Sequence, residues 1–247
     1  MSQAKERPIL FSGPMVRAIL EGRKTVTRRP VKGGQIPRLE YPDSPEPWIA
    51  VGQHHPRYGF VVHGKTEREC AVKVGELGAC PFGELGDRLW VRETWLEDPE
   101  DDGTWAYTQY MGCKGSPLSD IPKRFQKPER CIFRASWDGS ALRWRPSIHM
   151  PRWASRILLE VTDVRVERLQ DGEGETDSES RYVAEGIHRI HHGDGEHYYH
   201  PFKSEPGPGN WADPFDAWRE LWVSINGADS WNANPWVWVV EFKRVQP

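Results

Sequence analysis

The stretch G-R-K-T-V-T-R-R at residues 22–29 decides how the rest of the chain is interpreted. Before it, apolar residues recur at a spacing of four over residues 14–21, which predicts a short amphipathic helix. Gly22 suits the left-handed position after a helix, so we expect the helix to end there. The cations and hydroxyls of residues 22–29 would then form a loop directly after the helix.

The chain is locally basic around this loop. From Lys5 to Arg38 there are nine Lys or Arg residues against two Glu, although the whole chain of 247 residues has a formal net charge of -3. A patch of this kind attracts phosphates, nucleotides or polynucleotides. The alternative is an ordinary solvated turn, which is what most runs of charge form. The net charge argues against a wholly basic nucleic-acid coat protein.

A nucleophile and a base can be drawn from the same stretch. A threonine hydroxyl needs a neighbouring base to attack at neutral pH. Lys24 could be that base if burial and the nearby arginines lower its pKa. Lys24 and Thr27 are three residues apart, so they would face opposite sides of a regular strand and could meet only in a turn or helical segment. Thr25 remains a competing nucleophile.

The remaining pattern predicts an α+β fold in one domain, residues 1–247, with long insertions at about 30–85, 97–130 and 187–210. The 23 glycines and 21 prolines limit helix length. Strands are expected at residues 58–63, 70–74, 88–95, 131–136, 156–169 and 236–245, and a turn at Gly86-Asp87. A helix is expected within residues 170–186, where Thr176 and Glu179 have capping-box spacing, and another from Asp213-Pro214 to Asn226-Gly227. The acidic run at residues 97–102 is interpreted as a solvated loop.

Composition excludes several classes of protein. No window approaches 18 consecutive apolar residues, and the first residues lack the apolar core of a secretory signal, so we expect neither a membrane span nor export. The cysteines at positions 70, 80, 113 and 131 show no CxxC spacing, which favours reduced thiols in the cytoplasm. Five histidines between residues 188 and 200 lack zinc-ligand spacing and are interpreted as part of a mobile polar loop. We therefore expect no metal and no cofactor.

The pattern Gly-x-Lys-x-x-Thr-x-Arg, here Gly22, Lys24, Thr27 and Arg29, resembles the signature of the ASCH-domain family. That family has a PUA-like fold, a small β-barrel with flanking helices. Three further segments resemble the family in the same order: the turn into a strand at Gly86–Leu89, the end of the second helix at Ala184–Ile187, and the closing strand at Trp236–Lys243. The resemblance covers roughly half of the chain in separated blocks, and the three long excursions would be insertions.

Within this family the basic loop is most similar to that of the bacterial amidohydrolases that act on N4-acetylcytidine. The resemblance implies hydrolysis of an N4-acyl amide to cytidine and a carboxylic acid, without a metal. Thr27 would be the nucleophile, Lys24 its base and Glu185 the acid that protonates the leaving group. Arg23 and Arg29 would contribute to substrate binding. The expected partner is a small nucleoside, with RNA as the alternative, and the sequence gives no oligomeric state.

Glu93 is the rival carboxylate. It would share a strand face with Leu89 and Val91, where a charge is costly unless it is paired. It could bind the substrate or hold Lys24 or Arg29, or it could be an ordinary glutamate at a sheet edge. Among the 13 tryptophans, Trp95, Trp144 or Trp153 could stack a pyrimidine base.

Two other functions remain open at this stage. One is a non-catalytic module that binds RNA or a modified base, and the other is a ribonuclease that uses the same basic loop. The trio of Lys24, Thr27 and Glu185 discriminates between them, because a binding module needs positive charge but no nucleophile with its base and acid.

Overall fold

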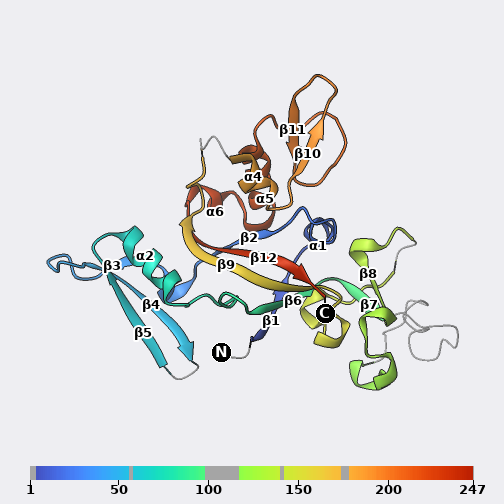
Figure 1. Cartoon of the computed structure of the whole chain (residues 1–247), viewed down its shortest axis with the longest axis horizontal. Helices are drawn as coiled ribbons and strands as arrows, with labels where there is room; N and C mark the ends of the chain where they lie inside the picture. The colour runs from blue at the N-terminus through green and yellow to red at the C-terminus, as the bar shows by residue number, and fades with distance from the viewer. Residues whose placement is uncertain (1–3, 56–57, 98–116, 140–141, 174–177, 247) are drawn as a thin grey trace. The chain divides into compact units, whose positions relative to one another are not determined.

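A computed structural model describes residues 4–55, 58–97, 117–139, 142–173 and 178–246. The fold is α+β, as predicted (Figure 1). The chain divides into two compact units. Unit 1 comprises Met1–Glu21, Arg88–Glu160 and Arg244–Pro247, and unit 2 comprises Gly22–Asp87 and Val161–Lys243. The residues of the candidate site at positions 23–29 and 185 belong to unit 2.

Unit 1 begins with strand β1 (Glu6–Leu10) and helix α1 (Gly13–Leu20). The helix confirms the predicted segment, with Ser12 as its N-cap and the buried side chains of Val16 and Ile19 on its apolar face. Strand β6 (Arg88–Arg92) pairs in parallel with β1 and antiparallel with the first residues of β9 (Leu158–Arg168). Strand β6 is therefore shorter than the strand predicted at residues 88–95. It ends at Arg92, and β7 (Trp95–Glu97) follows as a separate strand.

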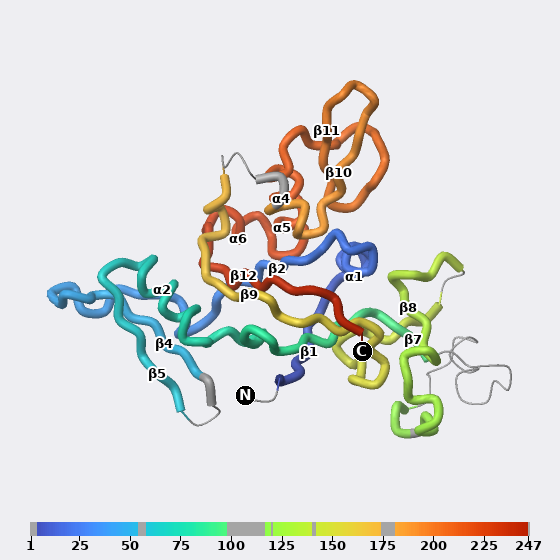
Figure 2. The backbone as a smooth tube through the Cα atoms, in the orientation of Figure 1, coloured from blue at the N-terminus to red at the C-terminus, as the bar shows by residue number. Residues whose placement is uncertain are grey.

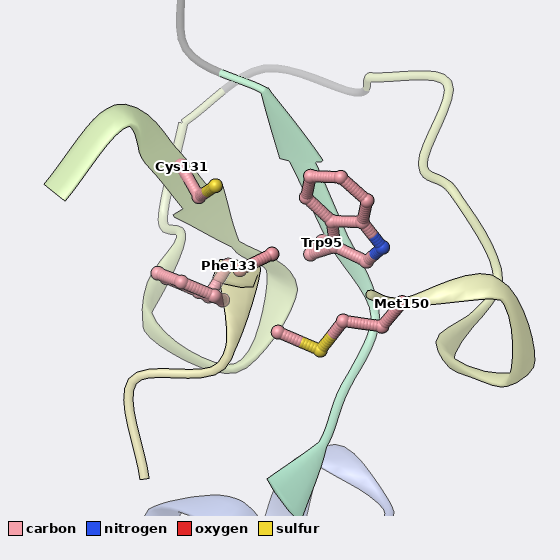
Figure 3. Packing of buried hydrophobic residues seen from close by; sticks show 5 residues of the cluster. Trp95, Cys131, Phe133 and Met150 are labelled. Atoms are coloured by element: carbon pink, nitrogen blue, oxygen red, sulfur yellow. The ribbon is translucent and has the colours of Figure 1, made fainter. Parts of the chain in front are cut away.

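Strands β7 and β8 (Cys131–Phe133) form a two-stranded antiparallel ribbon. Trp95 of β7 lies in a buried cluster with Cys131 and Phe133 of β8 and with Met150 (Figure 3). The Trp153 ring meets Trp95 edge to face at a centroid distance of 5.5 Å. Because Trp95 is fully buried, it is not available to stack a base. Short 3-10 turns connect these segments, at Leu118–Asp120, Lys123–Phe125, Pro128–Arg130, Arg134–Ser136, Ser147–His149 and Arg152–Ala154.

Unit 2 contains the strands that hold the basic loop. Strand β2 (Val26–Pro30) pairs antiparallel with β12 (Trp236–Val245), so that Thr27 lies opposite Val240 and Arg29 opposite Trp238. Within unit 1 the strand order is β1-β6-β9, and within unit 2 it is β9-β12-β2. None of the sheets in the described part of the chain closes into a barrel.

The excursion at residues 30–85 has more structure than its sequence predicts. Strands β3 (Arg38–Leu39), β4 (Trp48–His55) and β5 (Tyr58–Gly64) form an antiparallel sheet after a 3-10 turn at Gly33–Gln35. Helix α2 (Glu67–Glu76) packs on β4 and β5, and so the predicted strand at 70–74 is wrong.

The start of α2 explains that error. The Thr66 hydroxyl accepts a hydrogen bond from the Glu69 amide, which caps the helix at its N-terminus. Cys70, Ala71 and Val74 then lie on one buried face at helical spacing. The apolar segment around these residues is too short for its sequence periodicity to distinguish a helix from a strand.

The histidine-rich excursion at residues 187–210 is also ordered. Strands β10 (His188–His191) and β11 (His197–His200) form an antiparallel hairpin, in which His188 lies opposite His200 and His191 opposite His197. The prediction of a mobile loop is wrong for these residues, because Ile190 and Tyr199 are buried and fix the hairpin. Helix α5 (Pro214–Asn226) packs against β11 (Figure 2).

Three helices complete unit 2: α4 (Ser178–Val183), α5 (Pro214–Asn226) and α6 (Ala228–Asn232). Helix α5 confirms its prediction, with the Asp213 carboxylate capping the Phe215 amide at 2.8 Å. Tyr182 of α4 stacks on Trp218 of α5 at a centroid distance of 5.1 Å, and both side chains are buried. Thr176, half of the predicted capping box, lies outside the described residues. None of the described helices is long and apolar enough to cross a membrane.

Candidate active site

The basic loop is held by backbone bonds to the segment that follows α4. Gly22 has φ +77, a conformation that glycine adopts without strain, and the chain turns there as predicted. Lys24 and Glu185 then form an isolated antiparallel bridge, and the Ala184 carbonyl accepts from the amides of Thr25 and Val26. Residues that are about 160 positions apart in sequence are thus fixed side by side.

Lys24 lies at the centre of the site, buried to 2 % exposure. Its Nζ atom is 2.7 Å from Glu185 Oε2, 2.8 Å from Glu185 O and 2.7 Å from Val26 O. These three acceptors match the three N–H donors of an ammonium group, so the arrangement suits a protonated lysine. To act as a base, Lys24 must lose a proton and release one of these contacts.

Glu185 follows α4 and is buried to 3 % exposure. Gly186, at φ +99, turns the chain after it. The second carboxylate oxygen, Oε1, accepts from Arg28 Nη1 at 2.9 Å, so that two cations share one carboxylate. Burial alone would raise the pKa of Glu185, but Lys24 and Arg28 outweigh it and the pKa lies below its ordinary value. Glu185 is therefore ionised in the free protein.

Burial is the main reason that the pKa of Lys24 lies below its ordinary value; the charge of Glu185 opposes this shift, and Arg29 and Arg28 add to it. The sequence prediction that nearby arginines would lower this pKa is confirmed in direction, although burial is the larger cause. Burial also lowers the pKa of Arg29, against the attraction of Glu185. Arginine nevertheless keeps its charge at neutral pH.

Thr27 is buried to 2 % exposure on β2. Since successive side chains of a strand point to opposite faces, Thr27 and Arg29 share one face and Arg28 lies on the other. The Val26 carbonyl, which directly precedes Thr27, accepts a hydrogen bond from Lys24. The predicted contact of Glu185 with Lys24 is confirmed, whereas its predicted reach to Thr27 stays a prediction.

Arg23 connects the loop to the hairpin. Its guanidinium donates to the Gly186 carbonyl, and Nη2 is 3.3 Å from His188 Nε2. Arg23 therefore contacts the segment that directly follows Glu185, and its role in substrate binding stays a prediction.

Glu93, the rival carboxylate, belongs to unit 1 and has its own partner there. Arg156 binds it through two hydrogen bonds of 2.9 Å each, and the same guanidinium reaches Ser136 at 2.9 Å. Burial raises the pKa of Glu93 despite this pairing. Lys24, in unit 2, has Glu185 as a carboxylate partner.

The acidic run offers one correction. Glu97 is fully buried at the end of β7 and is paired with Arg145, whose Nε lies 2.6 Å from Oε2. It is not part of a solvated loop, because β7 carries its side chain into the interior. The other acidic residues of the run lie outside the described residues.

The described residues contain no group of three or more His, Cys, Asp or Glu side chains that could hold a metal. His191 and His197 meet edge to face at 5.5 Å, but the Nδ1 atom of His191 accepts from the Gly193 amide. Cys70, Cys80 and Cys131 are buried thiols, and Cys113 lies outside the described residues.

Sequence reasoning missed the role of Arg28. It reads as one of several adjacent cations and lies outside the Gly-x-Lys-x-x-Thr-x-Arg pattern. Nothing in the spacing indicates that a single β2 residue would reach both Glu185 and, at 3.8 Å, Glu167 of β9. Only the tertiary pairing reveals it.

No family model matches the chain, and neither a curated protein nor a solved structure matches it.

Proposed function

We propose that this protein is an amidohydrolase that cleaves the N4-acyl amide of acylated cytidines, with N4-acetylcytidine as the reference substrate. The observation that carries the proposal is the buried contact of 2.7 Å between Lys24 and Glu185, directly beside the residue that precedes Thr27. A module that only binds nucleic acid would keep its lysines exposed to phosphate. Here the lysine is withdrawn from solvent and its pKa is lowered, as a general base requires.

We further propose that the α+β core is PUA-like. The basic motif lies between α1 and β2, Glu185 follows α4, and the closing strand β12 pairs with β2. This order of elements is the one that the resemblance to the ASCH-domain family implies. The excursions at about residues 30–85, 97–130 and 187–210 would be additions to that core, the first with β3, β4, β5 and α2 and the last with the β10–β11 hairpin.

In the proposed reaction neutral Lys24 takes the hydroxyl proton of Thr27 while the oxygen bonds to the acyl carbon. The carbonyl π electrons move to oxygen, and Arg29, on the same strand face as Thr27, is placed to stabilise that charge. The intermediate collapses, the bond to N4 breaks, and the amine leaves with a proton. Water then hydrolyses the threonine ester to the carboxylic acid and restores Thr27.

The lowered pKa of Glu185 changes how the acid step must work. An ionised carboxylate cannot donate a proton until it has received one. The contact of 2.7 Å allows the proton that Lys24 takes from Thr27 to pass to Oε2 and then to the leaving amine. Glu185 is thus a relay rather than a resident acid. Because all three groups are buried, substrate binding must also open the site.

The test is to incubate the pure protein with N4-acetylcytidine and follow cytidine release by ultraviolet absorbance. Thr27→Ala should abolish turnover, because it removes the attacking oxygen, whereas Thr25→Ala should keep the wild-type rate within about twofold. Thr25 is the matched control since it is the neighbouring threonine and its side chain is exposed. Wild-type turnover by Thr27→Ala, or an inactive Thr25→Ala, would overturn the assignment of the nucleophile. An inactive wild-type protein that binds the nucleoside would favour the non-catalytic module.

A further inference from the structure

We propose that Arg28 is a positioning residue of this site, which holds Glu185 so that only Oε2 faces Lys24. Arg28 occupies Oε1 at 2.9 Å while Lys24 occupies Oε2 at 2.7 Å. A carboxylate with a cation on each oxygen cannot rotate about its terminal bond without losing both contacts. The inference extends the proposed function to a residue outside the Lys24, Thr27 and Glu185 set.

Arg28 is itself held from three sides. Its guanidinium lies over the Trp218 ring of α5, 5.4 Å from the centroid. Its Nη2 atom is 3.8 Å from Glu167 Oε2 on β9, and Nη1 binds Glu185. Glu167 is held in turn by Arg165 at 2.7 Å and by Arg181 of α4. The side chain of Arg28 is buried to 2 %, so its orientation is set by packing as well as by charge.

The charges around Lys24 explain how Arg28 affects the protonation of Lys24, the proposed base. Glu185 is the anion in contact with Lys24, and the cations Arg28 and Arg29 lie close to it on β2. Arg28 shares the negative charge of Glu185, which leaves less of it to stabilise the ammonium of Lys24. Removing Arg28 leaves the whole carboxylate to Lys24, so the ammonium becomes harder to deprotonate. Glu167, Arg165 and Arg181 act on Arg28 rather than directly on Lys24.

The experiment combines kinetics with a readout that needs no activity. Arg28→Met should lower kcat at neutral pH by about tenfold or more and move the acid limb of the kcat profile to higher pH by about one unit, the smallest shift expected for a change of charge at this range. KM should change less than kcat. Arg28→Lys keeps a charge without the fork of the guanidinium and should restore part of the rate. Arg68→Met is the matched control, because Arg68 of α2 is exposed and pairs with Asp171 rather than with a residue of this cluster.

The second readout is the protonation of Lys24 followed by NMR of lysine side-chain nitrogens, with Lys24→Arg to assign the signal. The Lys24 midpoint should move to higher pH in Arg28→Met and stay unchanged in Arg68→Met. An unchanged midpoint in a folded Arg28→Met protein overturns the role of Arg28 even if the enzyme is active. A shifted midpoint in a protein without amidase activity retains the positioning role and rejects the proposed substrate. If Arg28→Met does not fold, the same measurements on Arg28→Lys decide, since an unchanged midpoint and rate there also overturn the inference.

Discussion

At the scale of single residues, the site depends on one lysine that makes three hydrogen bonds. The three acceptors around Lys24 suit an ammonium, while burial favours the neutral amine. Because these two effects oppose each other, Lys24 is suited to change its protonation state during a reaction. An arginine at this position would keep a charge but could not become neutral near pH 7.

We therefore predict that Lys24→Arg is as inactive as Lys24→Ala toward N4-acetylcytidine, because neither side chain can accept the Thr27 proton. Initial rates of cytidine release measure this, with Lys32→Arg as the control because Lys32 is exposed just after β2. Retention of most of the rate by Lys24→Arg would show that position 24 supplies charge and not a base.

The sequence predicted part of this arrangement and could not predict the rest. The partnership of Lys24 with Glu185 came from the resemblance, since 161 positions separate the two residues and no local pattern connects them. The sequence predicted a loop over residues 22–29, and this is wrong for residues 26–29, because they belong to β2 and pair with β12. The role of Arg28 could not be predicted, because its neighbours lie just after α4, on α5 and on β9. Contacts between separate elements leave no periodic signal in the sequence.

At the scale of elements, Glu185 is placed by the packing of α4 on α5. The Glu185 amide donates to the Tyr182 carbonyl at 3.0 Å, and the Tyr182 ring stacks on Trp218. Trp218 also lies beneath the Arg28 guanidinium. One aromatic side chain of α5 therefore supports both the segment that carries Glu185 and the arginine that binds it.

We predict that Trp218→Ala lowers the free energy of unfolding by about 3–5 kcal/mol and reduces kcat by more than tenfold at temperatures where the variant remains folded. Trp231→Ala is the control, because its ring contacts Phe215 and Trp218 from α6. It should lose stability but keep the wild-type kcat. Urea unfolding together with initial rates measures both effects, and equal kcat losses in the two variants would remove the link between α5 and the site.

Helix α5 and strand β12 were predictable from sequence, whereas α2 and the β10–β11 hairpin were not. Helix α5 has an Asp213 cap and an apolar face over three turns, and β12 spans ten residues and begins with five consecutive apolar residues. The ten-residue α2 and the four-residue strands of the hairpin owe their form to neighbours: α2 to the β4–β5 sheet, and β11 to α5. Tertiary packing decides such short segments, which is why their local patterns were misread.

At the scale of the whole molecule, the proposed chemistry uses only side chains and water. We predict that EDTA at a large excess leaves the rate of N4-acetylcytidine hydrolysis unchanged within about twofold, because Lys24, Thr27 and Glu185 supply the base, nucleophile and proton relay. The measurement compares rates after dialysis with and without chelator. Loss of activity that zinc restores would contradict the prediction and point to the histidines of the hairpin.

The last prediction concerns acid stability of the chain, because Glu185 carries a charge that two buried cations require. In the unfolded chain its pKa is about 4.3, and in the folded protein it is lower. As the pH falls below about 4.3 the unfolded state therefore binds more protons than the folded state, and the free energy of unfolding decreases. The contribution of Glu185 is fully present above that pH and is lost as the pH falls through the folded pKa.

Glu185→Gln should accordingly be less stable than the wild type at pH 7, by about 3–5 kcal/mol, because Lys24 and Arg28 keep their charges without a carboxylate. The difference should narrow between pH 7 and pH 3, since only the wild type loses this contribution on acidification. Urea unfolding followed by tryptophan fluorescence measures it, with Glu205→Gln as the control at an exposed position. A stability difference that stays constant over this range would show that the carboxylate charge of Glu185 does not hold the buried cluster together.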